Sequence, residues 1–547
     1  MPPNSAGSGL PAVVALSFLI LTVKGQQFAY EPGDVQYIPS AATITSASES
    51  PDGIYFSTAD GLLFFDNFTQ QLEIVPSLNM GLPSHNLYHV YYDSAREGLW
   101  VVYDGGIAYR LEIEEVWHEV SRLALPDFFR GRSVTRLGGA FDGIWVDMGG
   151  VYTHLDSFTG DLLEQRISIP NEPVNWNVSQ NDFYTPPNLM DWITGGDWTT
   201  NISEFNGPGF TRAVPTLVFR DQYDQSWIGT DIGVIFRGDP NTRQLEEFQV
   251  GIAPKPVITM YVDGDGMWFA DNPFRRIGAG SERREGYFLS RWDERVASWR
   301  HYSSLSSEAI RDAGISDMLR VGKELWLATM DGIVLLNTRN DTWRYISSHE
   351  GLRDPAVWAV EQYEGEVFAA TIKGVDRINP STRTIIPEDS LSYSPPVEVY
   401  CLETIGNTLY AGTAIGIYTF QKKNHNHWRR ISGLPAISLW GDQDEIFAIA
   451  HNRIYYQKSP SPEFDLYPVQ PTGGPKILEI RGHGAYIWLA TASGVFVFDR
   501  REHQKYMLGR RDGLPSEVIY AIEFSNDWVW FITRDGVVRM RWEVYFD

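Results

Sequence analysis

Four arginines stand within ten positions of one polar stretch, residues 271–286: Arg275, Arg276, Arg283 and Arg284. The chain as a whole is acidic, with 45 Lys and Arg against 69 Asp and Glu. Guanidinium groups bind carboxylates and phosphates through paired hydrogen bonds, so the cluster is typical of a loop that binds an anionic ligand or partner. The alternative interpretation is a solvated loop whose positive charge neutralises the acidic surface around it.

Aromatic residues form a second group with binding chemistry. Residues 167–213 include Trp176, Tyr184, Trp192 and Trp198 among Asn, Asp, Gly and Pro. Aromatic rings beside amide and carboxylate groups are typical of surfaces that bind an oligosaccharide or a peptide. The alternative is that these rings fill the core of a degenerate repeat, because the segment has about the length of one repeat.

Catalytic motifs are missing from the sequence. It contains no His-Glu-x-x-His, no Gly-x-Ser-x-Gly and no phosphate-binding glycine loop. The single cysteine, Cys401, lies in the apolar run Val397–Leu402, which indicates a buried strand thiol rather than a nucleophile. We therefore expect a protein that is not an enzyme and that uses no cofactor and no metal. A hydrolase or lyase would need carboxylates that only the fold brings together.

The elements that must position these residues are repeats. A string with an aromatic residue, small residues and a Gly turn recurs, for example at Trp227–Val234, Trp326–Ile333 and Trp488–Val495. Most successive aromatic positions are 37 to 45 residues apart, and they are Tyr55, Trp100, Trp145, Trp227, Trp268, Trp326, Phe368, Tyr410, Phe447, Trp488 and Trp530. This spacing predicts an all-β fold of about 11–12 four-stranded β-propeller blades. The doubled gap after Trp145 has room for one degenerate blade.

Strand order predicts which turns share a face. Residues 315–346 divide into four short strands separated by turn residues, and the second and third strands are nearly all apolar. In four antiparallel strands, the turn between strands two and three lies on the same side as the connection to the next blade. The Thr-x-x-Gly turn and the Gly-Leu-Pro element (Gly81–Ser84, Gly433–Pro435, Gly513–Ser516) should therefore share one face. We call it the top face.

These strings together resemble the two-component regulator propeller repeat. The resemblance rests on Gly-Leu-Pro-Ser, on an acidic turn such as Asp263–Gly266 and on Trp-x-x-Thr-x-x-Gly-Val, and it covers most of residues 50–547. Members of that family are commonly periplasmic sensor domains followed by a membrane helix and a kinase, and some exported relatives work in secretion or at the cell surface. Because this chain ends inside the last repeat, the resemblance implies sensor-like recognition without a kinase domain.

The repeat spacing predicts two propellers in tandem. Residues 306–547 contain six regularly spaced copies, and residues 26–305 contain five copies with an irregular insert near 168–212. The expected boundary lies near His301–Ser307. A single ring of eleven or twelve blades is the alternative, and the strand Val35–Ile38 is a candidate to close a distant blade.

The N-terminus and the net charge indicate the compartment. The apolar run Leu10–Val23 is too short to span a bilayer comfortably and is typical of a signal peptide, here residues 1–25, with an uncleaved anchor as the alternative. The net charge of −24 argues against nucleic acid and anionic membranes as partners. We expect no membrane span in the mature chain and a periplasmic, extracellular or cell-surface location.

Together these features predict an exported, non-catalytic β-propeller that binds a ligand or protein partner on its top face. The expected partner is an oligosaccharide, a peptide or a protein. Two alternatives stay open, a scaffold subunit of a cell-surface or secretion assembly and a propeller hydrolase or lyase.

Overall fold

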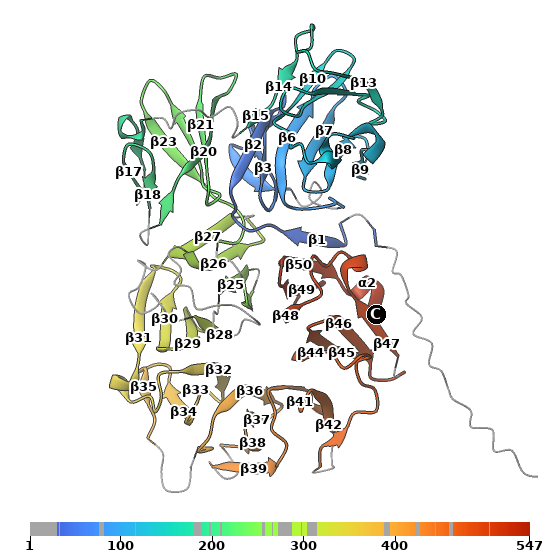
Figure 1. Cartoon of the computed structure of the whole chain (residues 1–547). Helices are drawn as coiled ribbons and strands as arrows, with labels where there is room; N and C mark the ends of the chain where they lie inside the picture. The colour runs from blue at the N-terminus through green and yellow to red at the C-terminus, as the bar shows by residue number, and fades with distance from the viewer. Residues whose placement is uncertain are drawn as a thin grey trace, which may run out of the picture.

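The computed structural model is an all-β molecule. It describes residues 30–546, apart from residues 32, 76–80, 115, 180–187, 196–197, 208–210, 254–256, 265, 272–286, 297, 304–313, 388–393, 423–426, 443–444, 459–462 and 503. The described helices are single turns: Arg122–Ala124 (η1), Phe128–Arg130 (η2), Leu189–Asp191 (η4), Ser348–Glu350 (η8), Arg510–Asp512 (η9) and Glu543–Phe546 (α2). Two groups of sheets are visible in Figure 1, with β1 (Val35–Ile38) between them.

The C-terminal group, here called the ring, has seven blades in the described residues. In chain order its strands are Thr259–Asp263 (β24), Gly266–Ala270 (β25), Tyr287–Asp293 (β26) and Ser298–Ser303 (β27); Ile315–Val321 (β28), Glu324–Thr329 (β29), Gly332–Asn337 (β30) and Thr342–Ile346 (β31); Val357–Tyr363 (β32), Glu366–Thr371 (β33), Gly374–Asn379 (β34) and Thr384–Ile385 (β35); Val399–Ile405 (β36), Thr408–Thr413 (β37), Gly416–Phe420 (β38) and Trp428–Ser432 (β39); Ser438–Gly441 (β40), Glu445–Ala450 (β41), Arg453–Lys458 (β42) and Asp465–Leu466 (β43); Ile477–His483 (β44), Tyr486–Thr491 (β45), Gly494–Asp499 (β46) and Lys505–Leu508 (β47); Ile519–Ser525 (β48), Trp528–Thr533 (β49) and Gly536–Arg541 (β50). The first strands of successive blades contact one another, and β24 contacts β48, so the ring is closed.

The N-terminal strand completes the last blade. β1 pairs antiparallel with β50, with Val35 opposite Met540 and Ile38 opposite Val537. Tyr37 lies within the core of this blade, which also contains Val538 and Met540. The last blade therefore takes its fourth strand from the other end of the described chain, which confirms the expectation for Val35–Ile38.

The blade β24–β27 belongs to the ring, so the expected boundary near residues 301–307 is wrong. The ring of Phe269 lies 6.0 Å from that of Trp530, and Trp292 lies 5.5 Å from the same indole. β25 pairs directly with β26 across residues 271–286, so the 58-residue gap after Trp268 reflects a long connection inside one blade. The division between the two groups falls between β23 and β24.

The N-terminal group, here called the arc, has four complete blades in the described residues. Their strands are Ile44–Glu49 (β2), Gly53–Thr58 (β3), Gly61–Asp66 (β4) and Gln71–Ile74 (β5); Leu87–Asp93 (β6), Gly98–Tyr103 (β7), Gly106–Leu111 (β8) and His118–Glu119 (β9); Arg136–Ala140 (β10), Gly143–Asp147 (β11), Tyr152–Leu155 (β12) and Leu162–Arg166 (β13); Pro215–Arg220 (β20), Ser226–Thr230 (β21), Ile235–Asp239 (β22) and Gln244–Phe248 (β23). The contacts of their first strands give the spatial order β20, β2, β6, β10.

The segment between β13 and β20 forms six very short strands instead of a twelfth blade. They are Asn175–Trp176 (β14), Val178–Ser179 (β15), Ile193–Thr194 (β16), Thr199–Thr200 (β17), Phe205–Asn206 (β18) and Arg212–Ala213 (β19). β14 pairs with β10 and β15 pairs with β2, so one extended stretch lies along the first strands of two blades. β16 joins the outer strand β23, and β17–β19 form a small sheet of their own.

The recurring aromatic residue lies on the second strand of all eleven complete blades. Seven of these residues are tryptophans that are at most 1 % exposed: Trp100, Trp145, Trp227, Trp268, Trp326, Trp488 and Trp530. In the ring and in the two inner blades of the arc, neighbouring blades cover both faces of each sheet, which explains why an aromatic side chain is buried at this position. In the end blade β10–β13, Trp145 is covered by His154 and Arg166. Burying a large apolar side chain of this kind stabilises the fold by roughly 2–3 kcal/mol.

The recurring threonine and glycine are explained by two hydrogen bonds. Thr329 Oγ1 donates to the carbonyl of Gly332 at 2.8 Å, which closes the turn, and Gly332 has a φ of 114° that favours glycine. The Gly332 amide then donates to the carbonyl of Pro355, in the connection to the next blade, at 2.7 Å. Gly61 and Gly494 donate in the same way, so the Thr-x-x-Gly turn and the interblade connection do share the top face.

Candidate binding site between the arc and the ring

Top-face turns of the arc and of the ring meet around a cavity of about 830 Å³. Two copies of the Gly-Leu-Pro element line it, Leu82–Asn86 from the arc and Gly513–Pro515 from the ring. Their neighbouring turns also contribute, Ala59 and Asp60 on one side and Thr533–Val537 on the other. The cavity therefore belongs to both groups of blades and exists only because they pack against each other.

The strand β1 and the residues after it form one wall of the cavity. Tyr37 Oη donates to Asp60 Oδ1 at 2.5 Å, and the Ser40 amide donates to Asp60 Oδ2 at 2.8 Å. The Tyr37 ring stacks on His85 with the ring centres 3.7 Å apart. Burial and the adjacent Asp60 raise the pKa of Tyr37 well above its usual range, so its hydroxyl stays protonated. These contacts hold the arc and the ring together at the cavity.

The rest of the lining combines apolar walls with charged side chains. Leu82 and Leu514 are buried, and the prolines that follow them, Pro83 and Pro515, also line the cavity. Arg510 and Arg534 are exposed lining residues, and neither makes an ion pair within the described part of the chain. Guanidinium groups beside an apolar wall suit a ligand with an anionic group on an apolar body. The lining also includes the exposed carboxylates of Asp104 and Asp535.

The predicted tryptophans do not line this cavity, and only Trp192 and Trp198 share a cluster. Trp198 is 3 % exposed and packs against Phe205 and Phe236 in the core of blade β20–β23, so it is not a surface binding residue. Trp192 is partly buried against the same core. Trp176 is partly exposed on β14, and the Arg136 guanidinium lies 4.9 Å from its ring centre. Trp192 and Trp198 are thus core residues, as the alternative interpretation expected, but the core that they fill is that of the complete blade β20–β23 rather than of a degenerate blade.

Five predicted site residues lie outside the described residues. They are Tyr184, Arg275, Arg276, Arg283 and Arg284. The signal peptide expected for residues 1–25 also lies outside them. The anion-binding loop and the signal peptide therefore stay predictions.

Charged side chains gather on the first strands of the ring, around its axis. Glu361, Glu403, Arg481 and Glu523 occupy the same register position, each opposite the central aromatic residue of its blade. Arg481 lies 2.8 Å from Glu479 and 3.5 Å from Glu523. Burial raises the pKa of Glu361 to about 7, of Glu403 to about 8 and of Glu523 to about 7.

Two further carboxylates at this axis join neighbouring blades. Asp317 Oδ2 accepts from the Val360 amide and Glu479 Oε2 from the Ile522 amide, both at 2.9 Å. In the arc, Ser46 accepts from the Val90 amide at 2.7 Å and so makes the corresponding contact. These contacts support a structural role for part of the cluster. Within the described ranges, no three His, Cys, Asp or Glu side chains are placed to hold a metal ion.

Sequence reasoning missed both the cavity and the axial cluster, although each has a sequence signal. The axial residues Glu361, Glu403, Arg481 and Glu523 each stand seven positions before the aromatic residue of their repeat. The cavity is indicated by Gly-Leu-Pro-Ser, which occurs at residues 81–84 and again at 513–516. Neither signal shows by itself that its copies face one another.

Comparison with known proteins identifies similar folds but no sequence family. No family model and no curated sequence relative matches it. Among solved structures, PorZ, a bacterial surface component of the type-IX secretion system of Porphyromonas gingivalis, is 12 % identical with a TM-score of 0.54, covering 93 % of this chain and 87 % of PorZ. The extracellular domain of the putative one component system BT4673 from B. thetaiotaomicron is 12 % identical with a TM-score of 0.42, covering 91 % of this chain and 70 % of that one.

These likenesses concern architecture. In the part of the chain that the structure describes, no helix has the length and apolar character needed to cross a membrane. The similarity to PorZ extends over both the arc and the ring. The chain therefore has the fold of tandem β-propellers.

Proposed function

We propose that this protein is an exported, non-catalytic recognition module whose ligand binds in the cavity between the arc and the ring. The observation that carries the proposal is the meeting of two Gly-Leu-Pro turns, from opposite ends of the chain, around about 830 Å³ of space. A cavity of this size accommodates a small ligand or a short segment of a polymer. It lies on the top face, where the loops of a rigid scaffold commonly carry function.

The lining supports a ligand that has anionic groups and an apolar body. Arg510 and Arg534 supply guanidinium groups to the cavity, and Leu82, Pro83 and Leu514 supply apolar surface. An acidic peptide with apolar side chains has this chemistry, and an acidic oligosaccharide offers its carboxylates together with the apolar C–H faces of its sugar rings. A nucleic acid is not proposed, because the net charge of −24 opposes the approach of a long polyanion.

The contacts of three axial carboxylates, Asp317, Glu479 and Glu523, favour a structural role over catalysis. Asp317 and Glu479 accept hydrogen bonds from backbone amides of the next blade, and Arg481 forms ion pairs with Glu479 and Glu523. These carboxylates are thus engaged in holding the first strands together. The hydrolase or lyase alternative requires two carboxylates that are free to act on a substrate.

Calorimetric titration with two probes tests the proposal. The probes are a tetramer of galacturonic acid and a peptide with alternating Glu and Leu. We expect one of them to bind, and we expect the double variant Arg510→Ala, Arg534→Ala to weaken binding about tenfold or more, because a hydrogen bond to a charged group contributes about 1.5–3 kcal/mol.

The matched control for this titration is Arg344→Ala, which removes an exposed arginine on the outer strand β31 of the ring. Binding by the control should equal that of the unmodified protein. Equal weakening by both variants would indicate a general charge effect, and absence of binding by both probes would reject the ligand class.

A second candidate is a subunit of a cell-surface secretion assembly. It is favoured by the likeness to PorZ, a surface component of such a system, over 93 % of this chain. Fractionation of cells that make the tagged protein tests this: the surface role requires the chain in the outer-surface fraction and in a complex larger than its own mass. A protein found only as a free species outside the cell would reject it.

A further inference from the structure

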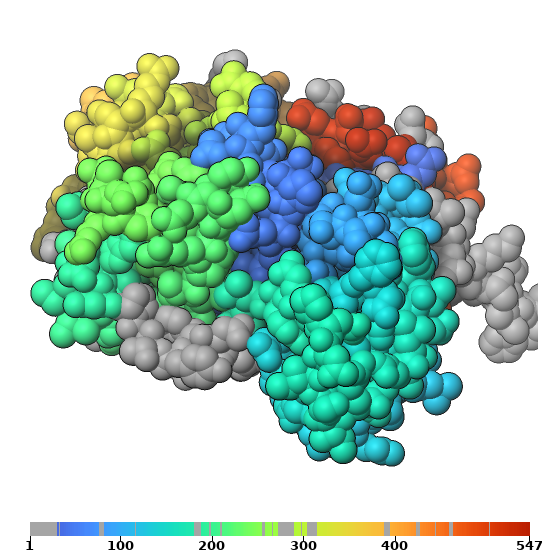
Figure 2. Space-filling model, turned by 90° about the horizontal axis from the view of Figure 1, so that it is seen from above, coloured from blue at the N-terminus to red at the C-terminus, as the bar shows by residue number. Residues whose placement is uncertain are grey.

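The arc exposes large apolar side chains at the tips of its turns on the face opposite the cavity. This far face is made by the turns between strands one and two and between strands three and four of each blade. Phe68 is 94 % exposed, Ile113 88 % and Phe141 97 %, and Val116, Phe158 and Tyr223 are also more than half exposed. Figure 2 shows the molecule from above with the arc nearest the viewer, so the ring does not cover this side. Exposed apolar groups gathered on one face indicate an interaction surface.

Contacts between turns make the far face continuous from the second blade to the third. Arg96 donates to the Phe141 carbonyl at 2.9 Å, and its guanidinium lies 5.6 Å from the centre of the Phe158 ring. Tyr109, in the neighbouring blade, donates to the Phe158 carbonyl at 3.0 Å. The turn that carries Ile113 is joined to the same blade, since Arg110 donates to the Glu114 carbonyl.

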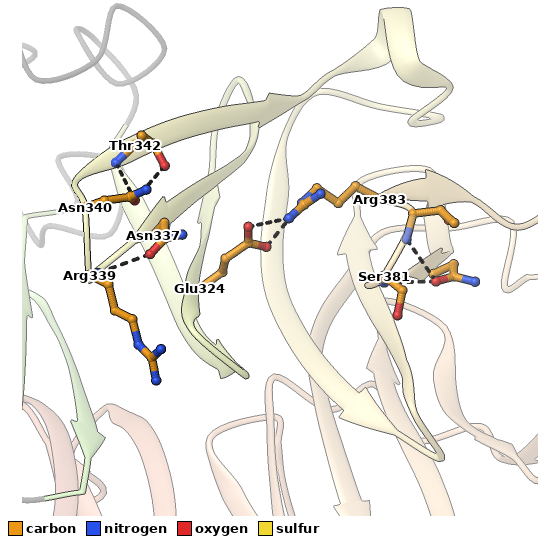
Figure 3. Close-up of polar contacts among 9 residues, drawn as sticks. Glu324, Asn337, Arg339, Asn340, Thr342, Ser381 and Arg383 are labelled. Atoms are coloured by element: carbon orange, nitrogen blue, oxygen red, sulfur yellow. Dashed lines mark hydrogen bonds and ion pairs between the residues drawn. The ribbon is translucent and has the colours of Figure 1, made fainter.

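At least two of the corresponding turns of the ring are instead paired with the preceding blade, although Val296, on the turn between β26 and β27, is exposed as well. Figure 3 shows Arg383, in the turn after β34, bound to Glu324 at the start of β29 of the preceding blade, at 2.6 Å. Glu366 and Lys422 repeat this interblade pair at 2.7 Å. Asn337 accepts from the Arg339 amide and caps its own turn.

The second strands of the arc begin without such an acid. They start at Gly53, Gly98, Gly143 and Ser226. In the ring, three of the seven second strands start with an acid, at Glu324, Glu366 and Glu445, and the other four start at Gly266, Thr408, Tyr486 and Trp528. The described blades of the arc therefore lack the interblade pairs that Glu324 and Glu366 form in the ring, and several of their turn tips carry apolar side chains.

Acidic side chains surround the apolar tips. Glu97, Glu112, Asp142 and Asp161 are exposed on the same turns. The basic groups here are engaged, since Arg96 lies 3.7 Å from Asp93 and Arg110 bonds Glu114. A second copy of this chain would bring the same acidic turns, and an anionic membrane would be repelled.

We infer that the far face of the arc is a docking surface for a basic protein segment that carries apolar side chains. Its lysines or arginines would pair with the turn carboxylates, and its apolar side chains would cover Phe141, Phe158 and Ile113. This surface lies on the opposite side of the arc from the cavity, so the inference does not depend on the proposed ligand.

Binding of a synthetic peptide tests the inference. The probe has four repeats of Lys-Gly-Phe-Gly, and two comparison peptides replace its lysines with Glu or its phenylalanines with Ser. We expect the first peptide to bind the full chain about tenfold more tightly than either comparison peptide, and to bind less tightly as salt is raised from about 50 to 300 mM.

Two matched variants locate the binding. The first carries Phe68→Ser, Ile113→Ser, Phe141→Ser and Phe158→Ser on the far face of the arc. The second carries Val296→Ser, Ile372→Ser, Ile415→Ser and Met507→Ser, four exposed apolar residues of the ring. Only the first should lose affinity for the Lys-Gly-Phe-Gly peptide, by about tenfold. Because all eight side chains are exposed, both variants should keep the unfolding midpoint of the unmodified protein.

Binding of a different partner at the far face of the arc would give a different result in these experiments, and each such result would overturn the inference. Equal binding of the Lys and Glu peptides would show an apolar surface without charge preference. A dimer that the arc variant abolishes would identify a second copy, and sedimentation with zwitterionic or anionic vesicles that the arc variant abolishes would identify a membrane.

Discussion

The arc and the ring are built from the same repeat but use it differently. In the ring, seven blades close on themselves, the last with the help of β1, and the acidic strand starts Glu324 and Glu366 pair with basic turns of the next blade. In the arc, four blades are followed by a segment that forms short strands against β2, β10 and β23. The comparison shows that the same repeat can pair its outer turns between blades, as at Glu324–Arg383 and Glu366–Lys422 in the ring, or carry strongly exposed apolar tips, as at Phe68 and Phe141 in the arc.

Open strand edges explain the irregular segment of the arc. An exposed edge offers unpaired backbone groups to other chains, and closed rings avoid this. β14 and β15 pair with the inner edges of β10 and β2, and β16 pairs with the outer edge of β23. The segment that doubles the spacing after Trp145 therefore covers strand edges and does not form a further blade.

Removal of the Tyr37 side chain, which joins β1 to Asp60 of the arc, should have the largest effect on stability. It should destabilise the last blade of the ring more than the arc. Tyr37→Ala empties a buried site and leaves Asp60 without its phenol partner, so we expect a loss of about 3–5 kcal/mol in unfolding free energy. Hydrogen exchange should show that β48–β50 lose more protection than β10–β13. Tyr37→Phe keeps the ring contact with His85 and should lose much less. Equal loss of protection in both regions would mean that the arc and ring unfold as one unit.

A change of pH should affect the ring through its axial carboxyls. The raised pKa values of Glu361, Glu403 and Glu523, about 7, 8 and 7, mean that the folded chain binds these protons more tightly than the unfolded chain. Stability from this source is therefore fully present below pH 4.5, the ordinary value of the glutamate pKa, and is lost as pH rises through about 7 to 8. Urea unfolding at several pH values should show this slope, and Glu403→Gln should reduce it. An unchanged slope in the variant would exclude Glu403 as a contributor.

Loss of a turn hydrogen bond should have the smallest effect and should be similar in the two halves. Thr329 in the ring bonds the Gly332 carbonyl, and Thr230 in the arc bonds the Val234 carbonyl at 2.7 Å. Each Thr→Val change should cost about 1 kcal/mol, measured by urea unfolding. A clearly larger cost in the ring would show that turn chemistry, and not only closure, distinguishes the halves.

Much of the blade architecture was readable from the sequence, and less of the candidate site was. The aromatic spacing identified the second strand of every complete blade, because one buried side chain between two sheets is a local requirement. The same spacing assigned β24–β27 to the first propeller instead of the ring. A long connection inside a blade and a linker between two propellers both lengthen the spacing, so the spacing alone does not distinguish them. Trp198 was ambiguous for a similar reason: a tryptophan in a polar segment suits a core or a surface, and only packing against Phe205 and Phe236 distinguishes them.

The sequence by itself determined the repeat, the top-face turns and the acidic charge, because each depends on residues that are close in the chain. Tertiary structure alone decided that β1 completes the last blade, that Leu82 and Leu514 face one cavity and that Glu361, Glu403 and Glu523 share an axis. The physical reason is that these groups are brought together by closure of the ring and by its packing against the arc. Both depend on contacts between residues that are hundreds of positions apart.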